Sequence, residues 1–273
     1  MEFAAGKKEL IYKKVDPNNI GQIRDALLCE QEGFDNILDP QELPPVLQFI
    51  ARYGNIWLQY AAEDGEYNPI GMMELIPLVQ ALEYRSENID SGAYDLSLSP
   101  FTIIMANQER VFRDVRRFAG DEDIIYHHGV AMSRKGGGYG TLLLRHVFES
   151  DSRVKKGVVV GFPDAAYLDK DSGNIHLAPN ENSFTLHLKA GFVLAGVVNP
   201  PVYDNTIIYY SFIRVGEEYV APLRFRADKE VLNLAEGEAS TVIKSVKELI
   251  SESYLGVRYQ KEKHEMVFLK REK

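Results

Sequence analysis

The chain has 273 residues, of which 45% are hydrophobic and 26% charged, a balance typical of globular proteins that excludes a disordered, collagenous or coiled-coil chain. Its 40 acidic and 31 basic side chains give a net charge of −9, which disfavours nucleic acid as a partner and favours cationic ligands such as amines. The single cysteine, Cys29, cannot form an intrachain disulfide. The first ten residues lack an apolar signal segment and no apolar run reaches the length of a membrane helix. We therefore expect a cytoplasmic protein with no membrane partner.

The N-terminal part predicts one strand, two helices and a hairpin. A strand over residues 10–15 is followed by Asp16-Pro17, a pair typical of a helix start, and Ile20, Ile23 and Leu27 recur at helical spacing. Asp39-Pro40 repeats this start signal before a second apolar stripe, which Gly54 is expected to end. Residues 56–61 and 70–77 are predicted to be strands of a hairpin. Residues 80–120 are interpreted as an insertion, with a polar turn at 86–92 and a helical stretch at 108–118.

The remaining chain alternates strands and helices. We predict strands at 124–133, 157–162, 192–198 and 206–214, and helices at 141–149 and 180–190. The order predicts a mixed sheet with helices on both faces. After residue 214 the sequence predicts one more helix, marked by Val242, Val246, Leu249 and Ile250, and strands within 256–270. We expect a domain over residues 1–214 and a C-terminal extension over 215–273.

A glycine-rich turn joins the strand ending near Ser133 to the helix beginning at Thr141. Such a turn directs backbone N–H groups into one concavity at a helix N-terminus, which is the physical basis of an anion site. The turn contains Gly136, Gly137, Gly138 and Gly140. It matches neither the phosphate loop that ends in Gly-Lys-Ser/Thr nor the dinucleotide pattern, which comes early in its fold. On glycine content alone, a flexible turn remains an alternative.

Two stretches resemble motifs of one family. Residues 130–143, Val-Ala-Met-Ser-Arg-Lys-Gly-Gly-Gly-Tyr-Gly-Thr-Leu-Leu, resemble motif A of the GNAT superfamily of N-acetyltransferases. Residues 180–192, Asn-Glu-Asn-Ser-Phe-Thr-Leu-His-Leu-Lys-Ala-Gly-Phe, resemble its motif B. Lys135 stands where the family usually has arginine or glutamine, and Met132 where proline is frequent. The resemblance implies a GNAT-like α/β (mixed α+β) fold with a mostly antiparallel central sheet, but does not cover the insertion or the extension.

The resemblance also implies a co-substrate, acetyl-CoA, and the residues that hold it. Backbone N–H groups of the glycine turn would bind the pyrophosphate, and the end of the preceding strand would pair with the pantetheine arm and stabilise the thioester oxygen. Asn180 matches a position that often bonds the arm, although a helix cap is an alternative role for it. The expected cofactor-binding residues are Val130, Met132, Lys135, Gly136, Gly137, Gly138, Tyr139, Gly140, Thr141 and Asn180. No metal is expected.

Acetyl transfer to an amine needs a proton acceptor for the ammonium and benefits from an acid for the leaving thiolate. His187 stands at a motif B position that often carries the acid, with packing as the alternative. The candidate bases are His128 and Glu74 on neighbouring predicted strands, with Asp164 a weaker third. For each base the alternative is an ordinary polar group of the fold.

Three other features are interpreted as structural rather than functional. His127 and His128 are adjacent on a strand and therefore face opposite sides, so they cannot chelate one metal together. Cys29 has no evident base partner and is interpreted as a structural thiol. The basic run Arg110, Arg113, Arg116 and Arg117 is interpreted as a solvated helix face rather than a contact for the 3′-phosphate of CoA.

The predicted function is transfer of the acetyl group of acetyl-CoA to a primary amine of a small molecule or peptide. The alternatives are a catalytically silent acyl-CoA-binding sensor or scaffold, and an acyltransferase for longer chains. Acceptor choice is expected to depend on residues 34–39, the insertion and the extension, because the family core only holds the co-substrate. The apolar stripe of the last helix is buried either on its own core or in a homodimer.

Overall fold

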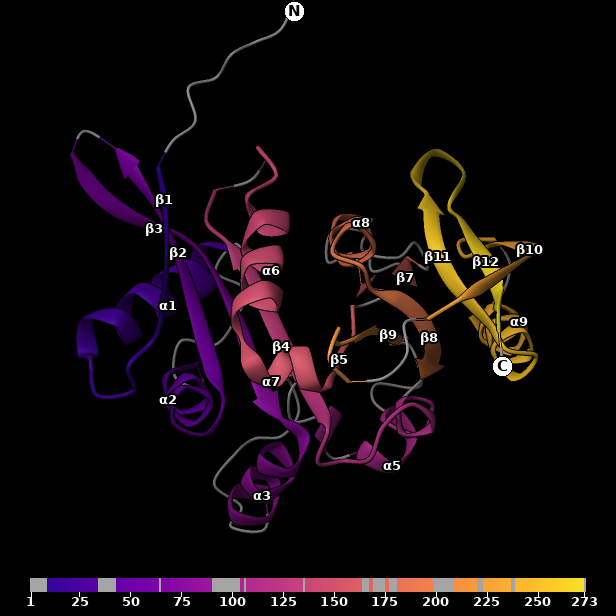
Figure 1. Ribbon diagram of the computed structural model, residues 1–273, viewed down its shortest axis with the longest axis horizontal. Coiled ribbons are helices and arrows are strands. Elements are labelled where there is room, and N and C mark those ends of the chain that lie inside the picture. Colours follow the sequence, from indigo (N-terminus) through magenta and orange to yellow (C-terminus); the bar gives the residue numbers. More distant parts are fainter. Residues whose placement is uncertain are drawn as a thin grey trace, which may run out of the picture. The chain divides into compact units, whose positions relative to one another are not determined.

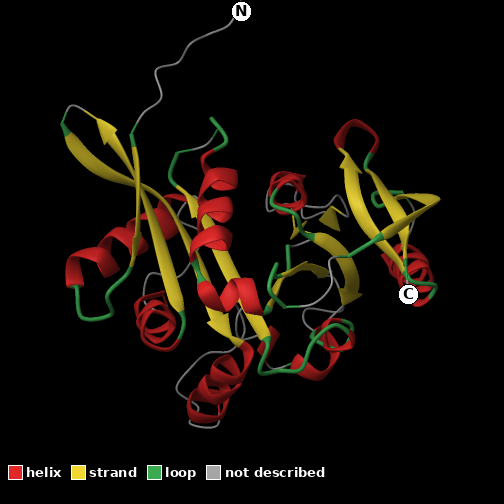
Figure 2. Cartoon of the chain, viewed as in Figure 1, coloured by secondary structure: helices red, strands yellow, loops and turns green. Residues whose placement is uncertain are grey.

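The computed structural model describes residues 9–33, 43–63, 65–89, 104–105, 107–134, 136–163, 167–168, 175–176, 181–198, 209–219, 223–236 and 239–272. Helices and strands are interspersed along the chain (Figures 1 and 2). Contacts between Cα atoms divide the chain into two compact units, which are described separately. The N-terminal unit comprises Met1–Ile76 and His127–Ser150, and the C-terminal unit comprises Pro77–Tyr126 and Asp151–Lys273.

The N-terminal unit holds four neighbouring strands in the order β1-β2-β3-β4. Its elements are β1 (Leu10–Lys14), α1 (Ile20–Gly33), α2 (Leu43–Tyr53), β2 (Asn55–Glu63), β3 (Glu66–Pro77), β4 (Ile124–Met132) and α6 (Tyr139–Ser150), of which the end of β3 and the start of β4 belong to the C-terminal unit. β2 pairs antiparallel with both β1 and β3, and Gly65, at a φ of +86°, forms the tight turn between β2 and β3.

Helices cover both faces of this small sheet. The Tyr60 hydroxyl on β2 donates a hydrogen bond of 2.8 Å to Asp25 of α1. Trp57, three residues earlier on the same strand, contacts the His146 ring of α6 edge-on. Because residues an odd number apart on a strand point to opposite faces, α1 and α6 cover opposite faces of β2. The predicted arrangement of helices on both faces is therefore confirmed for this unit.

The C-terminal unit contains strands in the order β5-β9-β8-β11-β12-β10, and the pairings described between them are antiparallel. Its other elements are short helices, a two-stranded ladder and two longer helices. The bounds are α3 (Leu78–Ile89), α5 (Gln108–Val111), the 3-10 helix η1 (Val115–Arg117), α7 (Ser152–Lys156), β5 (Val158–Gly161), β6 (Tyr167–Leu168), β7 (Ile175–His176), α8 (Glu181–Lys189), β8 (Val193–Val198), β9 (Tyr209–Val215), β10 (Phe225–Asn233), α9 (Ala239–Ser251), β11 (Tyr254–Gln260), η3 (Lys261–Lys263) and β12 (Glu265–Arg271).

The C-terminal strands continue the sheet of their unit instead of forming a separate layer. Gly256 on β11 pairs with Leu194 on β8, where an added Cβ would lie 2.9 Å from the Leu194 Cβ, so glycine permits this close approach. α9 packs on β8 and β11 and buries Val242 and Val246, which confirms the predicted apolar stripe. The stripe is thus buried on the chain's own core.

Part of the predicted insertion, residues 80–120, belongs to the hydrophobic core of the C-terminal unit. Val111, Phe112 and Val115 are fully buried, and the Phe112 ring packs edge-on against Tyr126 and Phe162. The predicted helical stretch over 108–118 is two short helices, α5 and η1. The sequence predicts a polar turn over residues 86–92. For residues 86–89 this prediction is wrong, because they form the last turn of helix α3. Residues 90–103 lie outside the described residues.

The first helix begins later than predicted. Asp16 accepts a hydrogen bond from the Asn18 N–H in a turn, and Asn19 caps α1 by accepting from the Gln22 N–H at 3.1 Å. Ile20, predicted to belong to the buried stripe, is 85% exposed. The buried face of α1 consists instead of Ala26, Cys29 and Glu30.

The remaining predicted strands and helices in the described residues are present within a few residues of their expected ends. The sequence did not predict α7 or β10. α7 is short and begins at an Asp151 cap that accepts from the Arg153 N–H. β10 is largely exposed along its length, so it lacks the alternation by which strands are usually predicted. The start signal Asp39-Pro40 lies outside the described residues.

The two compact units do not coincide with the predicted domain of residues 1–214 and the predicted extension of residues 215–273. Strands β10 to β12 share a sheet with β8, and the insertion helix α5 also packs on β8. The domain boundary at residue 214 stays a prediction.

Candidate functional site

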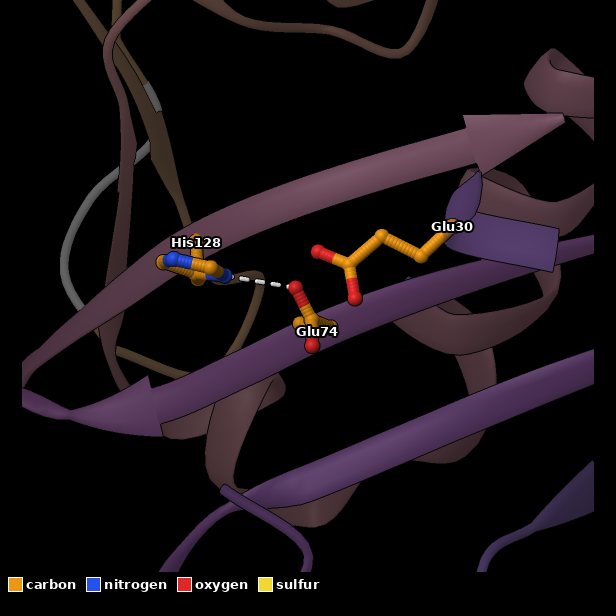
Figure 3. Close-up of side chains that lie close together, drawn as sticks. All are labelled: Glu30, Glu74 and His128. Carbon is orange, nitrogen blue, oxygen red and sulfur yellow. Dashed lines mark hydrogen bonds and ion pairs between the residues drawn. The ribbon is translucent and has the colours of Figure 1, made fainter. Parts of the chain in front are cut away.

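Two predicted base candidates, Glu74 and His128, meet in the N-terminal unit. They lie on the neighbouring strands β3 and β4, and Nδ1 of His128 is 2.5 Å from Oε2 of Glu74 (Figure 3). The Glu74 side chain is 1% exposed and that of His128 is 12% exposed. A short bond between a buried carboxylate and an imidazole with limited solvent access is suited to accepting and sharing a proton.

Glu30 is a third member of this site that the sequence did not predict. It lies on the buried face of α1 at 3% exposure, and its carboxyl group extends toward Glu74 and His128 (Figure 3). The helix end comes close to β4 because Gly33 lacks a side chain: an added Cβ would lie 2.8 Å from both the Ala131 Cβ and the Met132 nitrogen. The sequence signal for Glu30 is its position three residues after Leu27 and seven after Ile23, which continues the apolar stripe predicted for this helix.

Burial governs the charge of Glu30. Loss of solvation, together with repulsion from the nearby Glu74 carboxylate, raises the pKa of Glu30 to about 9. The Glu30 carboxyl group is therefore protonated at neutral pH. Glu30 next to the Glu74–His128 pair thus adds a buried proton without adding a second negative charge.

The three residues are named the Glu-Glu-His cluster, and their geometry is compatible with binding a cation. One ligand atom from each of Glu30, Glu74 and His128 lies within 4.8 Å of the other two. Gly129 leaves space for the carboxylate, because an added Cβ there would lie 3.2 Å from Oε2 of Glu74. His127, in contrast, is bonded through Nε2 to the Gly129 carbonyl at 3.0 Å and does not belong to the cluster.

The glycine turn adopts a backbone that requires glycine. Gly136, Gly137 and Gly138 have φ values of +87°, +64° and +75°, a conformation that side chains with a Cβ disfavour. All three are exposed. The turn leads directly into α6, and the Leu142 N–H of this helix donates to the Gly138 carbonyl at 3.1 Å. Free N–H groups at the start of α6 therefore adjoin an open, glycine-lined loop, the arrangement expected for an anion site.

Side chains flanking the turn have structural partners. Arg134 donates to the Glu63 carboxylate, and this bond raises the pKa of Arg134 above its usual value. A Cβ added to Gly137 would lie 2.8 Å from the Tyr139 ring. This close approach is a second reason for glycine at that position. Val130, Met132, Gly140 and Thr141 are all partly exposed, and Lys135 lies outside the described residues.

His187, which was predicted to be the acid, does not lie in an environment that suits this role. It is 4% exposed on α8, its ring packs against Phe192 and Phe212, and Nδ1–H donates to the Ser183 carbonyl at 2.7 Å. Burial lowers the pKa of His187 to about 4. Since the ring is neutral at pH 7, this environment favours the packing alternative over the general acid.

The remaining candidates behave as structural groups or lie outside the described residues. Burial and the nearby carboxylates of Glu32 and Asp25 raise the pKa of the Cys29 thiol to about 12, so Cys29 is not an activated nucleophile. Arg116 donates to both oxygens of Asp121, at 2.7 and 2.9 Å. Asn180 and Asp164 are outside the described residues. No helix among the described residues is long and apolar enough to cross a membrane.

Comparison with solved structures identifies the fold. An agmatine N-acetyltransferase superposes with a TM-score of 0.50 at 13% identity, covering 75% of this chain and 98% of its own. A polyamine N-acetyltransferase of Drosophila melanogaster, which catalyses the formation of N-acetylagmatine, superposes with a TM-score of 0.50 at 12% identity, covering 76% and 100%. No protein-family model and no curated protein matches the sequence. At such identities the likeness shows the fold alone, and the predicted mixed α+β, GNAT-like fold is confirmed.

Proposed function

We propose that this protein transfers the acetyl group of acetyl-CoA to a primary amine of a small molecule or peptide. The observation that carries the proposal is the glycine turn before α6, where three consecutive glycines adopt positive φ at the N-terminus of a helix. This geometry fits a pyrophosphate group, and it occurs in a chain with a GNAT-like fold. Bound acetyl-CoA would supply the thioester that the amine attacks.

The chain's residues would contribute binding, orientation and proton transfer. Backbone N–H groups of residues 136–140 would hold the pyrophosphate, and the end of β4 at Val130 and Met132 would align the acyl arm. An N–H of this strand end would stabilise the charge that develops on the thioester oxygen. In the transfer, a C–N bond forms and the C–S bond breaks, and the CoA thiolate leaves.

The Glu74–His128 pair would take the proton that an incoming ammonium must lose before it can attack. Geometry supports this role, since the two groups are hydrogen-bonded at 2.5 Å and only His128 is accessible to solvent to a useful degree. A buried single negative charge would also attract a cationic acceptor. Protonation of the leaving thiolate is assigned to solvent, because His187 is buried and neutral.

The test is a thiol-release assay with acetyl-CoA and a panel of amines: agmatine, polyamines, arylalkylamines, aminoglycosides, amino acids and peptides. Agmatine and polyamines head the panel because two proteins with a similar fold are an agmatine and a polyamine N-acetyltransferase. Amine-dependent release of free thiol, with an acetylated amine identified by mass spectrometry, is the expected result. Acetyl-CoA binding without release for any amine would instead identify a silent acyl-CoA-binding module.

A further inference from the structure

The Glu-Glu-His cluster has the composition of a transition-metal site. It combines one imidazole nitrogen with two carboxylate groups, and the three ligand atoms lie within 4.8 Å of one another inside the N-terminal unit. We propose that Glu30, Glu74 and His128 bind one divalent transition-metal ion, with Zn²⁺ as the best-fitting ion. This inference goes beyond acetyl transfer and does not depend on it.

Buried oxygens without partners are the observation that points to a cation. Among the described residues, Oε2 of Glu30 and Oε1 of Glu74 have no hydrogen-bond partner. Both side chains are more than nine-tenths buried, and the Glu30 carboxyl group extends into the cluster (Figure 3). Buried carboxyl oxygens normally find a donor or a cation, because leaving them unsatisfied is costly. A bound ion would satisfy both oxygens at once.

The ligand atoms, one imidazole nitrogen and carboxylate oxygens, favour some cations over others. Zn²⁺ binds nitrogen and carboxylate oxygen at about 2.0–2.2 Å, so its ligand atoms lie about 3.4 Å apart in a tetrahedral site. The more distant ligand atoms, at most 4.8 Å apart, would have to approach one another and the pair at 2.5 Å would have to separate, movements that rotation of the two flexible glutamate side chains can supply. Three protein ligands would leave a fourth position for water. Mg²⁺ is disfavoured because it prefers an octahedral shell of oxygens and keeps several waters.

The ion would replace the proton between Glu74 and His128. Nδ1 of His128 now faces Oε2 of Glu74 at 2.5 Å, and the same two atoms would become ligands. His128 is the most accessible member of the cluster and provides the route of entry. Because Zn²⁺ would occupy the atoms assigned to proton transfer, it would inhibit acetyl transfer to the amine.

Calorimetric titration of the metal-free full-length chain with ZnCl₂ tests the proposal. The titration is done at pH 8, without acetyl-CoA or amine, and Zn²⁺ binding is expected to displace the proton of Glu30, because metal ligands must be deprotonated. We expect one Zn²⁺ per chain, and an affinity at least about tenfold weaker in Glu30→Gln, since even groups that only support a ligand typically contribute that much. Glu32→Gln, an exposed residue of the same helix, is the matched control and should bind as the wild type does.

Substitution of the more accessible ligand gives an independent check. His128→Gln is expected to fold and to weaken Zn²⁺ binding in the same way, and Co²⁺ bound to the wild-type chain should show the visible absorption of a four-coordinate nitrogen and oxygen site. Absence of one-to-one binding, or equal affinity in wild type, Glu30→Gln and His128→Gln, would overturn the proposal. Thiol release plays no part in these measurements, so failure of the zinc site and failure of acetyl transfer are separate results.

Discussion

Nδ1 of His128 lies 2.5 Å from Oε2 of Glu74, although the two residues are 54 positions apart in the sequence. The contact depends on β3 and β4 being neighbours, and α1 places Glu30 beside the pair. A buried acid, a buried carboxylate and a partly exposed imidazole together form the group to which the proposed function assigns proton transfer from the amine.

Replacing either member of the pair should slow turnover. Glu74→Gln and His128→Gln are each expected to lower kcat by about 10²-fold, because the ammonium loses its proton acceptor. The dissociation constant of acetyl-CoA should change little, since the glycine turn is intact. Glu66→Gln, exposed on the same strand β3, is the matched control and should retain kcat. Wild-type kcat in both variants would remove the pair from the mechanism.

The glycine turn should control acetyl-CoA binding. Gly138→Asp places a side chain and a negative charge at the N-terminus of α6 and is expected to weaken binding at least about tenfold, measured by calorimetry. Gly65→Asp is the control, because Gly65 is also exposed, has a φ of +86° and would suffer the same backbone strain on the β2–β3 hairpin. Equal loss of binding in both variants would indicate a general folding defect, and unchanged binding in Gly138→Asp would refute the assignment.

His187 should affect the pH dependence of stability more than catalysis. Its pKa is about 4 in the folded chain and 6.5 ordinarily, so the unfolded chain binds the extra proton as the pH falls below 6.5. One pKa unit corresponds to about 1.4 kcal/mol, so His187 alone should lower the free energy of unfolding by about 3 kcal/mol between pH 6.5 and pH 4. Above pH 6.5 the ring is neutral in both states and contributes no pH dependence.

Denaturant unfolding of wild type and His187→Phe at pH 7 and pH 5 measures this difference. The wild type should lose more stability than the variant between the two pH values. In parallel, kcat of His187→Phe should stay close to that of the wild type, as expected for a packing residue. A loss of about 10²-fold in kcat at unchanged acetyl-CoA affinity would restore the acid role.

The insertion should be needed for folding of the C-terminal unit. Phe112 is fully buried against Tyr126 and Phe162, so Phe112→Ala is expected to lower the free energy of unfolding by about 3–5 kcal/mol. Val231→Ala, at a residue that is 44% exposed, should cost less than about 1 kcal/mol. Similar stability of the two variants, measured by denaturant unfolding, would contradict the role of Phe112 in the core.

The sequence by itself determined most of the strands and helices in their order, the β2–β3 hairpin and the strand, glycine turn and helix at residues 130–143. These features are local, because turns, helix ends and apolar alternation depend on neighbouring residues. The sequence also placed Glu74 and His128 on neighbouring strands as candidate bases. Local signals failed at the start of α1, where Asn19 and not Asp16 supplies the cap.

Only the tertiary structure decided which of these residues lie together. Glu30 was missed because periodicity assigns charged residues to the solvent face, whereas here Gly33 lets α1 approach β4 and buries the carboxyl group beside Glu74. His187 matched a motif position, yet its burial among Phe192 and Phe212 lowers its pKa and keeps the ring neutral at pH 7, which makes it a poor general acid. Burial and long-range proximity set the charge of an ionisable group, and neither is a property of the residues adjacent to it in the chain.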